Sequence, residues 1–160
     1  METGYANRKS PRAKFADYNA GHYFVTICTK ERMHYFGTIY NEEMHLSPIG
    51  QEAKLELCEI AKKYPFCDIP FFVVMPNHIH AIIIIDTSRN KDNREELSLL
   101  SLVVRQYKSR ITAYANKHGI EFGWQTRYHD HIIRGIHDGN KIAEYIANNV
   151  IKWNTDCFFK

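Results

Sequence analysis

The longest apolar segment of the chain lies near its middle and carries two histidines. It runs from Phe71 to Ile85 and is rich in β-branched and aromatic residues, which pack well on a pleated sheet. Pro76 cannot donate a backbone hydrogen bond to a sheet, and it stands between Met75 and Asn77 inside this segment. The pattern therefore predicts two consecutive strands joined by a turn at Pro76.

Strands and a helix are also predicted before this segment. Residues 22–29 have a strand-like composition, and a weaker strand or hairpin is expected over residues 34–40, turning through Gly37. Ser47 and Pro48 are typical of a helix N-terminus, because a serine side chain caps the first turn and proline suits the first helical position. Apolar residues then recur at helical spacing until Pro65 ends the predicted helix: Ile49, Ala53, Leu57 and Ile60.

Helical patterns return after the strand that carries the histidines. One helix is predicted from about residue 97 to residue 118, followed by Gly119 as a typical C-terminal residue. A last strand is predicted within residues 122–133. Asp138 is expected to cap a terminal helix whose buried stripe has steps of three and four residues: Ile142, Tyr145, Ile146, Asn149, Val150 and Trp153.

The predicted order of elements is strand, helix, strand, strand, helix, strand, helix. This order is typical of a split β-α-β arrangement. The sequence therefore predicts an α+β fold with a ferredoxin-like antiparallel sheet and with helices packed on one face. The histidine-containing strand is expected at the centre of that sheet.

Length and composition favour one globular domain. The chain has 160 residues, of which 44% are hydrophobic, and we expect a basic N-terminal arm over residues 1–14 and a single catalytic domain over residues 15–160. The four cysteines form no C-x-x-C pair, and the net charge of +3 permits an acidic partner such as nucleic acid. No apolar run is long enough for a membrane span and no signal core is present, so a cytoplasmic protein without membrane contact is expected.

The two histidines of the apolar segment are candidates for a metal site. On a strand, His78 and His80 point to the same face, roughly 7 Å apart along the strand from the rise per residue. They could instead be hydrogen-bonded core residues, but burying a polar ring where isoleucine would serve costs free energy. The spacing therefore favours a bound divalent cation.

Two histidines make an incomplete metal site, so an oxygen or amide ligand is expected from elsewhere in the chain. Asn149 is the polar member of the terminal stripe, and Tyr145 lies one turn before it. Asn149 is the candidate third ligand, and plain core packing is the alternative for Tyr145. Mixed nitrogen and oxygen ligands suit Mg²⁺ or Mn²⁺ bound to phosphate, and a tyrosine beside such an ion is a candidate nucleophile.

Basic residues are candidates for contacts with a phosphate backbone. The segment from Leu97 to Ile120 contains no aspartate or glutamate, and a solvated cationic face is the alternative. The candidate DNA-binding residues are Arg105, Lys108 and Arg110 in this segment and Arg12 and Lys14 in the arm.

In this combination the sequence resembles the single-tyrosine HUH transposases, and among them the REP-associated tyrosine transposases. The most specific part of the resemblance is the segment Val-Met-Pro-Asn-His-Ile-His, which occupies residues 74–80. Weaker matches follow the same order as in the family: residues 23–29, residues 46–50, Trp124-Gln125, residues 131–134 and residues 145–153.

The resemblance implies a transposase that nicks and rejoins single-stranded DNA near hairpins. His78 and His80 match the paired histidines of the HUH motif, which bind the catalytic cation. Tyr145 matches the nucleophile, which gives a 5′-phosphotyrosine and a free 3′-hydroxyl. Asn149 stands where the insertion-sequence branch places a glutamine ligand, and Val150 stands where relatives commonly carry proline. The family also implies a homodimer.

Two other functions are compatible with the sequence. A metal-dependent hydrolase would bind zinc through His78, His80, His129 and His131 and use water as the nucleophile, although the H-x-H-x-D-H continuation of metallo-β-lactamase-like hydrolases is absent. A non-catalytic nucleic-acid-binding module on a ferredoxin-like sheet would expose aromatic side chains on that sheet for base stacking.

Overall fold

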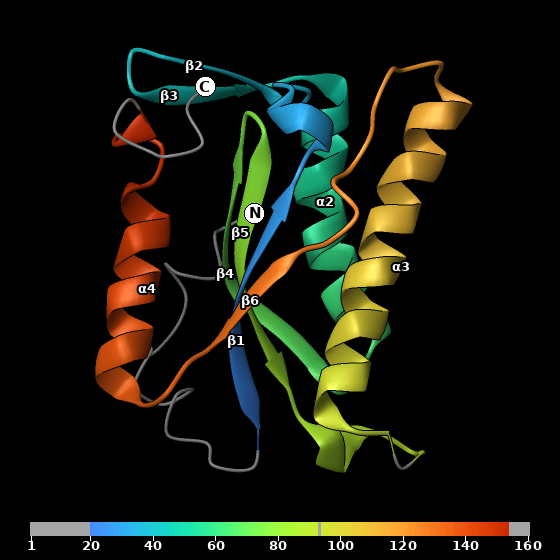
Figure 1. Ribbon diagram of the computed structural model, residues 1–160, viewed down its shortest axis with the longest axis vertical. Helices are drawn as coiled ribbons and strands as arrows, with labels where there is room; N and C mark the ends of the chain where they lie inside the picture. The colour runs from blue at the N-terminus through green and yellow to red at the C-terminus, as the bar shows by residue number, and fades with distance from the viewer. Residues whose placement is uncertain (1–19, 93, 154–160) are drawn as a thin grey trace.

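The computed structural model describes residues 20–92 and 94–153 of the chain (Figure 1). The predicted basic arm, including Arg12 and Lys14, lies outside the described residues. In chain order the elements are β1 (Gly21–Cys28), η1 (Lys30–Arg32), β2 (Gly37–Tyr40), β3 (Glu43–Leu46), α2 (Pro48–Lys63), β4 (Cys67–Met75), β5 (His78–Ile85), η2 (Thr87–Arg89), α3 (Glu96–Lys117), β6 (His129–Ile132) and α4 (Ile136–Asn148).

Four strands form one antiparallel sheet in the order β4-β5-β1-β6. The first strand therefore lies between the third and the last strand of the sheet, as in the split β-α-β arrangement. The predicted α+β fold with an antiparallel sheet is confirmed. The turn predicted at Pro76 is also confirmed, because β4 ends at Met75, β5 begins at His78, and these two residues pair with each other.

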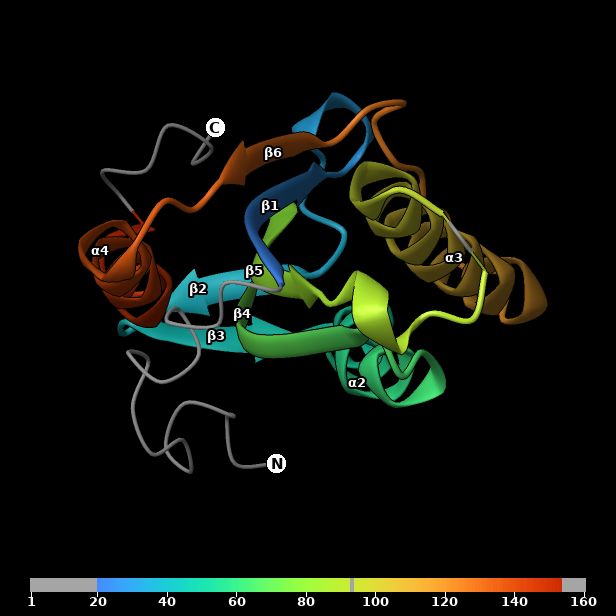
Figure 2. The ribbon, with the colours of Figure 1, turned by 90° about the horizontal axis from the view of Figure 1, so that it is seen from below.

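The helices cover both faces of this sheet (Figure 2). Alternate side chains of β1 and β5, such as Val25 and Ile79, belong to one core cluster together with α2 and α3. The other face carries Ile82 and Ile84, which cluster with Ala143 and Ile146 of α4. The expectation of helices on one face therefore holds for α2 and α3, whereas α4 covers the opposite face. Both faces of β5 are covered, so all eight of its residues are buried.

The hairpin after β1 turns at a different place from the one predicted. Strands β2 and β3 are joined by Asn41 and Glu42, with φ of 52° and 60°, whereas the sequence predicted a turn through Gly37. Two successive positive φ values are typical of the tight turn that matches strand twist. Gly37 begins β2 with φ of 145°, and a Cβ there would lie 2.1 Å from the carbonyl oxygen of His45. The glycine thus permits a close backbone approach instead of forming the turn.

The terminal helix begins before the predicted cap and ends before the predicted end. Gly135 precedes the helix, and Asp138 lies in its first turn, where the carboxylate accepts a hydrogen bond of 3.1 Å from the Arg134 backbone N–H. The helix ends at Asn148, so Trp153, which was expected to continue the helical stripe, follows it in a separate turn. Within the described ranges, no helix combines the length and apolar character that a membrane crossing requires.

The cap of α2 should contribute measurably to stability. The Ser47 hydroxyl accepts a hydrogen bond of 3.1 Å from the Gly50 N–H and donates one of 2.7 Å to the Tyr35 carbonyl. We expect Ser47→Ala to lower the free energy of unfolding by about 1 kcal/mol, the usual cost of losing such a cap. Urea unfolding checks this, with Ser109→Ala at an exposed position of α3 as the control. Equal losses in the two variants would contradict the cap's role.

The first turn of α4 should make stability depend on pH. The Arg134 backbone N–H, with a further contribution from His131, holds the pKa of Asp138 below its ordinary value, although burial acts in the opposite direction. A carboxyl whose pKa is lower in the folded state stabilises the fold above its unfolded pKa, about 3.9. We expect Asp138→Asn to be less stable than the wild type at pH 7, and this difference to disappear as the pH falls through the folded-state pKa. Urea unfolding at pH 7 and pH 2.5 (about 1.4 units below that reference value) tests this, and a constant difference would contradict it.

Candidate active site

His78 and His80 lie side by side at the start of β5, on the face of the sheet that α4 covers. Their side chains alternate with Ile79, which belongs to the opposite core. The two residues are 0% and 2% exposed, and their ring centroids are 4.5 Å apart. The predicted histidine pair is therefore buried and close enough for both rings to bind one ion.

Each ring has a hydrogen-bonding partner at Nδ1. The Asn77 amide donates through Nδ2 to the Arg32 carbonyl at 3.3 Å, which turns its oxygen toward His78 Nδ1 at 2.7 Å. Because that oxygen is an acceptor, Nδ1 of His78 must carry the proton. The Thr26 hydroxyl lies 2.9 Å from Nδ1 of His80. Partners at Nδ1 orient each ring, and Nε2 is then the atom that would coordinate an ion.

Burial keeps both imidazoles neutral. It lowers the pKa of His78 to about 2, with smaller contributions from the neighbouring His80 and from the Arg32 charge, while the Asn149 side chain acts in the opposite direction. Burial alone lowers the pKa of His80 to about 3. A neutral ring is the form that binds a metal, so no proton has to be displaced at neutral pH.

Helix α4 brings Tyr145 to this pair. The Tyr145 hydroxyl lies 3.5 Å from Nε2 of His80, at the outer limit of a hydrogen bond, and the two ring centroids are 5.3 Å apart. Phe24 of β1 packs against both rings, with centroid distances of 5.1 Å to His80 and 6.1 Å to Tyr145. Tyr145 is nevertheless 42% exposed, so one residue both approaches the buried histidines and reaches the protein surface.

Asn149 is the buried polar residue at the end of the same helix. It is 2% exposed, and its Oδ1 has no partner at hydrogen-bond distance among the described residues. An acceptor oxygen buried in this way is costly unless something else satisfies it. The described residues contain no group of three or more His, Cys, Asp or Glu side chains placed for a metal. A cation here would therefore use two imidazoles and one amide oxygen, and these residues fit that donor set.

Residues not identified as site residues from the sequence complete the surroundings of His78. The Trp153 ring lies over His78 at a centroid distance of 6.3 Å, and His34 packs edge to face on Trp153 at a centroid distance of 5.7 Å. Asn77 precedes His78 directly, so its role had a sequence signal in the polar residue before the pair. Thr26 and His34 had no such signal, because only the pairing of distant strands places them here.

The second histidine pair does not join the first. His129 and His131 are exposed on the edge strand β6, and β1 separates that strand from β5. Nε2 of His131 instead pairs with Asp138 at 3.2 Å. Since no metal-binding group of three or more His, Cys, Asp or Glu side chains exists among residues 20–92 and 94–153, the four-histidine zinc site considered from the sequence is wrong.

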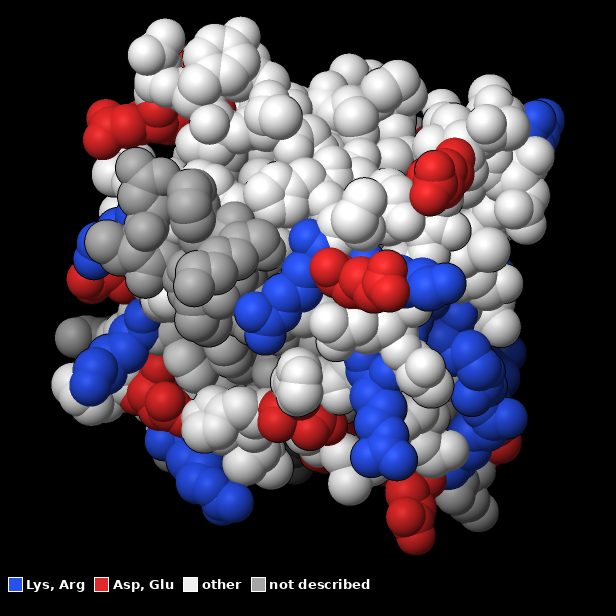
Figure 3. Space-filling model, turned by 45° about the horizontal axis from the view of Figure 1, so that its top comes forward, with Lys and Arg blue, Asp and Glu red and all other residues white. Residues whose placement is uncertain are grey.

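The predicted DNA-binding residues of α3 lie on the face of the sheet opposite the histidines. Arg105 is exposed, Lys108 donates to the Gln125 carbonyl at 2.8 Å, and Arg110 pairs with the buried Glu56 at 2.6 Å. Lys and Arg side chains are densest on the α3 side of the face seen in Figure 3. The three residues thus stay predictions for DNA contact, and two of them also hold α3 in place.

Comparisons with known proteins found similarity both in sequence and in fold. No protein-family model matches the chain. A Haemophilus influenzae protein, described only as uncharacterized, is 36% identical over 168 residues, which cover 96% of this chain and 93% of that protein.

One solved structure with a similar fold is that of a REP-associated tyrosine transposase bound to a REP hairpin. Its structure superposes with a TM-score of 0.59 at 22% identity, covering 82% of this chain and 67% of that one. At this identity the likeness concerns the fold alone. Because 36% identity extends over nearly all of both chains, the chain belongs to the family of the Haemophilus influenzae protein, on a fold that it shares with the REP-associated tyrosine transposase.

Proposed function

We propose that this protein is a transposase that nicks and rejoins single-stranded DNA, with Tyr145 as the nucleophile. The observation that carries this proposal is the 3.5 Å approach of the Tyr145 hydroxyl to Nε2 of His80, between residues 65 positions apart. An exposed tyrosine beside two buried neutral histidines is an unusual arrangement for core packing. It is the arrangement expected where a phenol attacks a phosphate held by a cation.

The ligands of that cation would be Nε2 of His78, Nε2 of His80 and Oδ1 of Asn149. Both rings are neutral, and the amide oxygen is buried, so the donors need no change of protonation. Three protein ligands leave positions for phosphate oxygens, which suits Mg²⁺ or Mn²⁺. When bound, such an ion supplies a Lewis acid that neutralises charge developing on the phosphate.

In the proposed step, the phenolic oxygen of Tyr145 attacks the phosphorus of a DNA phosphodiester. A bond forms between this oxygen and phosphorus, and the bond from phosphorus to the 3′-oxygen breaks. The phenolic proton passes to solvent and the departing 3′-oxygen takes up a proton, which leaves a 5′-phosphotyrosine and a 3′-hydroxyl. Rejoining reverses the same exchange on another 3′-end. A free phenol has a pKa of about 10, so loss of its proton near neutral pH requires the nearby positive charge.

In this proposal one chain supplies all the groups that the step requires. Tyr145 and Asn149 approach the histidines of their own chain, from a helix that packs on the same sheet. A homodimer, which the family resemblance implies, would then bring two complete sites together. A hairpin in single-stranded DNA is the proposed substrate, by analogy with the REP hairpin held by the structural relative.

A purely nucleic-acid-binding role has less support. Base stacking on a ferredoxin-like sheet needs exposed aromatic rings on its strands. Among the described residues of the sheet, Tyr23 and Phe71 are buried, while Phe24 and Phe72 are partly buried. Helices cover both faces, so the surface that such a module would use is occupied.

A covalent adduct is the direct test of the proposed nucleophile. Labelled single-stranded hairpin DNA incubated with the protein and Mn²⁺ should give a denaturation-resistant protein–DNA adduct. We expect Tyr145→Phe to abolish this adduct and His78→Ala to reduce it by about 100-fold or more, as for loss of a metal ligand in a catalytic site. Removal of divalent ions with EDTA should also suppress it. Denaturing gel electrophoresis measures each result.

The matched control for this experiment is Tyr128→Phe. Tyr128 is half-buried and its hydroxyl lies 3.2 Å from Ser101 Oγ, so the variant loses a comparable tyrosine hydroxyl away from the histidines. We expect its adduct to form at the wild-type rate. An adduct that persists in Tyr145→Phe would refute the assignment of the nucleophile, and DNA cleavage without any adduct would favour a hydrolase.

The Thr26 hydroxyl should tune the affinity for the cation. It lies 2.9 Å from Nδ1 of His80 and orients the ring that faces Tyr145. We expect Thr26→Val, which keeps the shape of the side chain, to weaken Mn²⁺ binding by about 10-fold to 100-fold. Calorimetric titration with Mn²⁺ measures this. Thr38→Val, at an exposed position of β2, is the control, and equal affinities in both variants would contradict the role of Thr26.

A further inference from the structure

The segment Lys30–His34, which follows β1, has an unfavourable backbone conformation next to the histidine pair. Glu31 and Arg32 have φ of 53° and 57°, a region that side chains with a Cβ rarely adopt. Neither residue is a glycine, asparagine or aspartate, and both are exposed. Such conformations persist where the surroundings impose them, and they are concentrated at ligand-binding sites. The segment is therefore a candidate ligand-binding segment.

Hydrogen bonds to Asn77 and Thr29, next to the histidine pair, hold this conformation. The Arg32 carbonyl accepts a hydrogen bond of 3.3 Å from Asn77, whose oxygen in turn lies 2.7 Å from Nδ1 of His78. The Thr29 hydroxyl lies 2.7 Å from the Met33 carbonyl and 3.0 Å from the Asn77 carbonyl. One amide thus links the segment to His78, and the Arg32 charge is close enough to help lower the pKa of that histidine.

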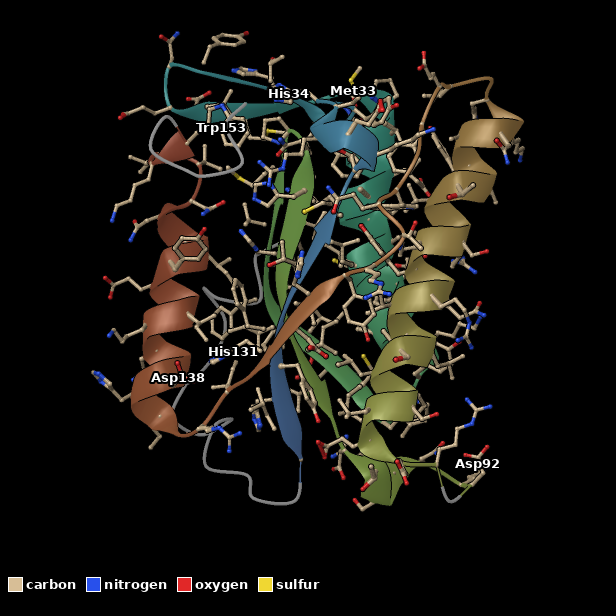
Figure 4. All side chains as sticks on the ribbon, viewed as in Figure 1. Met33, His34, Asp92, His131, Asp138 and Trp153 are labelled. Atoms are coloured by element: carbon tan, nitrogen blue, oxygen red, sulfur yellow. The ribbon has the colours of Figure 1, made fainter. Side chains whose placement is uncertain are left out.

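The same segment carries an exposed ring that packs on a buried tryptophan. His34 is exposed and contacts Trp153 edge to face, with centroids 5.7 Å apart, and Trp153 lies over His78. Figure 4 shows Met33, His34 and Trp153 at the same end of the sheet. Met33 adds an apolar side chain that is 48% exposed. One short segment therefore carries both a cation, Arg32, and an exposed ring, His34, and it is linked to His78 through Asn77 and Trp153.

We propose that the segment Lys30–His34 binds the nucleotide next to the phosphate that Tyr145 attacks. The Arg32 guanidinium would contact the phosphate of that nucleotide, and the His34 ring, supported by Trp153, would stack against its base. This assignment rests on the proposed function for its place in the reaction. Its chemistry is that of single-stranded nucleic acid binding, which combines cations along the backbone with aromatic rings under the bases.

The linkage through Asn77 gives this contact a consequence for the site. A phosphate held by Arg32 is held by the residue whose carbonyl orients Asn77, and Asn77 orients His78. The substrate would thereby be aligned with the histidine ring by one continuous set of contacts. Arg32 is accordingly a positioning residue, while Tyr145 remains the residue that reacts.

Binding of a labelled dT20 oligonucleotide tests the proposal without any reaction. We expect Arg32→Gln to weaken binding several-fold and to reduce the slope of log K against log salt by about 0.7, the value for one phosphate contact on a single strand. We expect His34→Ala to weaken binding about 5-fold or more through lost stacking, and His34→Phe to restore it. Fluorescence anisotropy at several salt concentrations gives both quantities.

Arg89→Gln is the matched control, because Arg89 is an exposed arginine that follows the far end of β5. It should leave the affinity and the salt slope unchanged. Arg32→Gly separates binding from folding: it relieves the positive φ, so thermal stability should be kept or raised while dT20 binding falls. An Arg32→Gly variant that loses stability and keeps its salt slope would overturn the proposal.

The two proposals fail in different ways. Unchanged dT20 binding in both Arg32→Gln and His34→Ala would overturn the assignment of this segment, whatever the adduct assay gives. Absence of an adduct in the wild type, with dT20 binding still dependent on Arg32, would overturn the transposase step and support the nucleotide-binding segment.

Discussion

The structure depends on the register between β5 and β1. This register places Cys28 opposite His78 and Thr26 opposite His80. A shift by one residue would turn both histidines into the apolar core beneath α2 and α3, and would bring Ile79 to the site. The same register supplies the hydroxyl that meets His80 and ends β1 where the following segment can reach Asn77. The register of one strand pair therefore decides which face of the sheet carries the candidate active site and which face packs in the main core.

Burial on the face that α4 covers has two effects on the histidines. It removes water, which makes the charged form of each ring unfavourable and lowers both pKa values. It also makes every unpaired polar atom unfavourable. At Nδ1, Asn77 provides a hydrogen-bonding partner for His78 and Thr26 provides one for His80. The result is a pair of fixed neutral rings, which is the state that a metal site needs before the metal arrives.

The end of α4 is as important as its beginning. The helix stops at Asn148, and the chain then turns so that Trp153 lies over His78. A helix continued to Trp153 would carry this ring further along the axis, away from the histidine that it covers. Asn149 directly follows the last helical residue, and its buried side chain interacts with the His78 ring. The early helix end thus lets Trp153 pack on His78.

Much of this protein is determined by the sequence itself. The apolar, β-branched run of residues 71–85 and the break at Pro76 specify the strand pair, and the Ser47-Pro48 start with its helical spacing specifies the first helix, because local composition and backbone preferences decide such elements. The two-residue spacing also determines that His78 and His80 share a face. Tyr145 and Asn149 share a helical face for the equivalent reason, and their joint position near the histidines came from resemblance to a family.

Tertiary structure alone decided the remaining features. Which face α4 covers depends on whether Ala143 and Ile146 meet Ile82 and Ile84, a contact between residues about 60 positions apart. Contacts between distant residues also decided that Lys108 and Arg110 hold α3 in place. They likewise decided that His131 lies apart from the first histidine pair, and they set the contacts of Thr26 and His34. A sequence pattern fixes the direction of a side chain within its own element, but a partner from another element is set only when the sheet has paired and the core has packed.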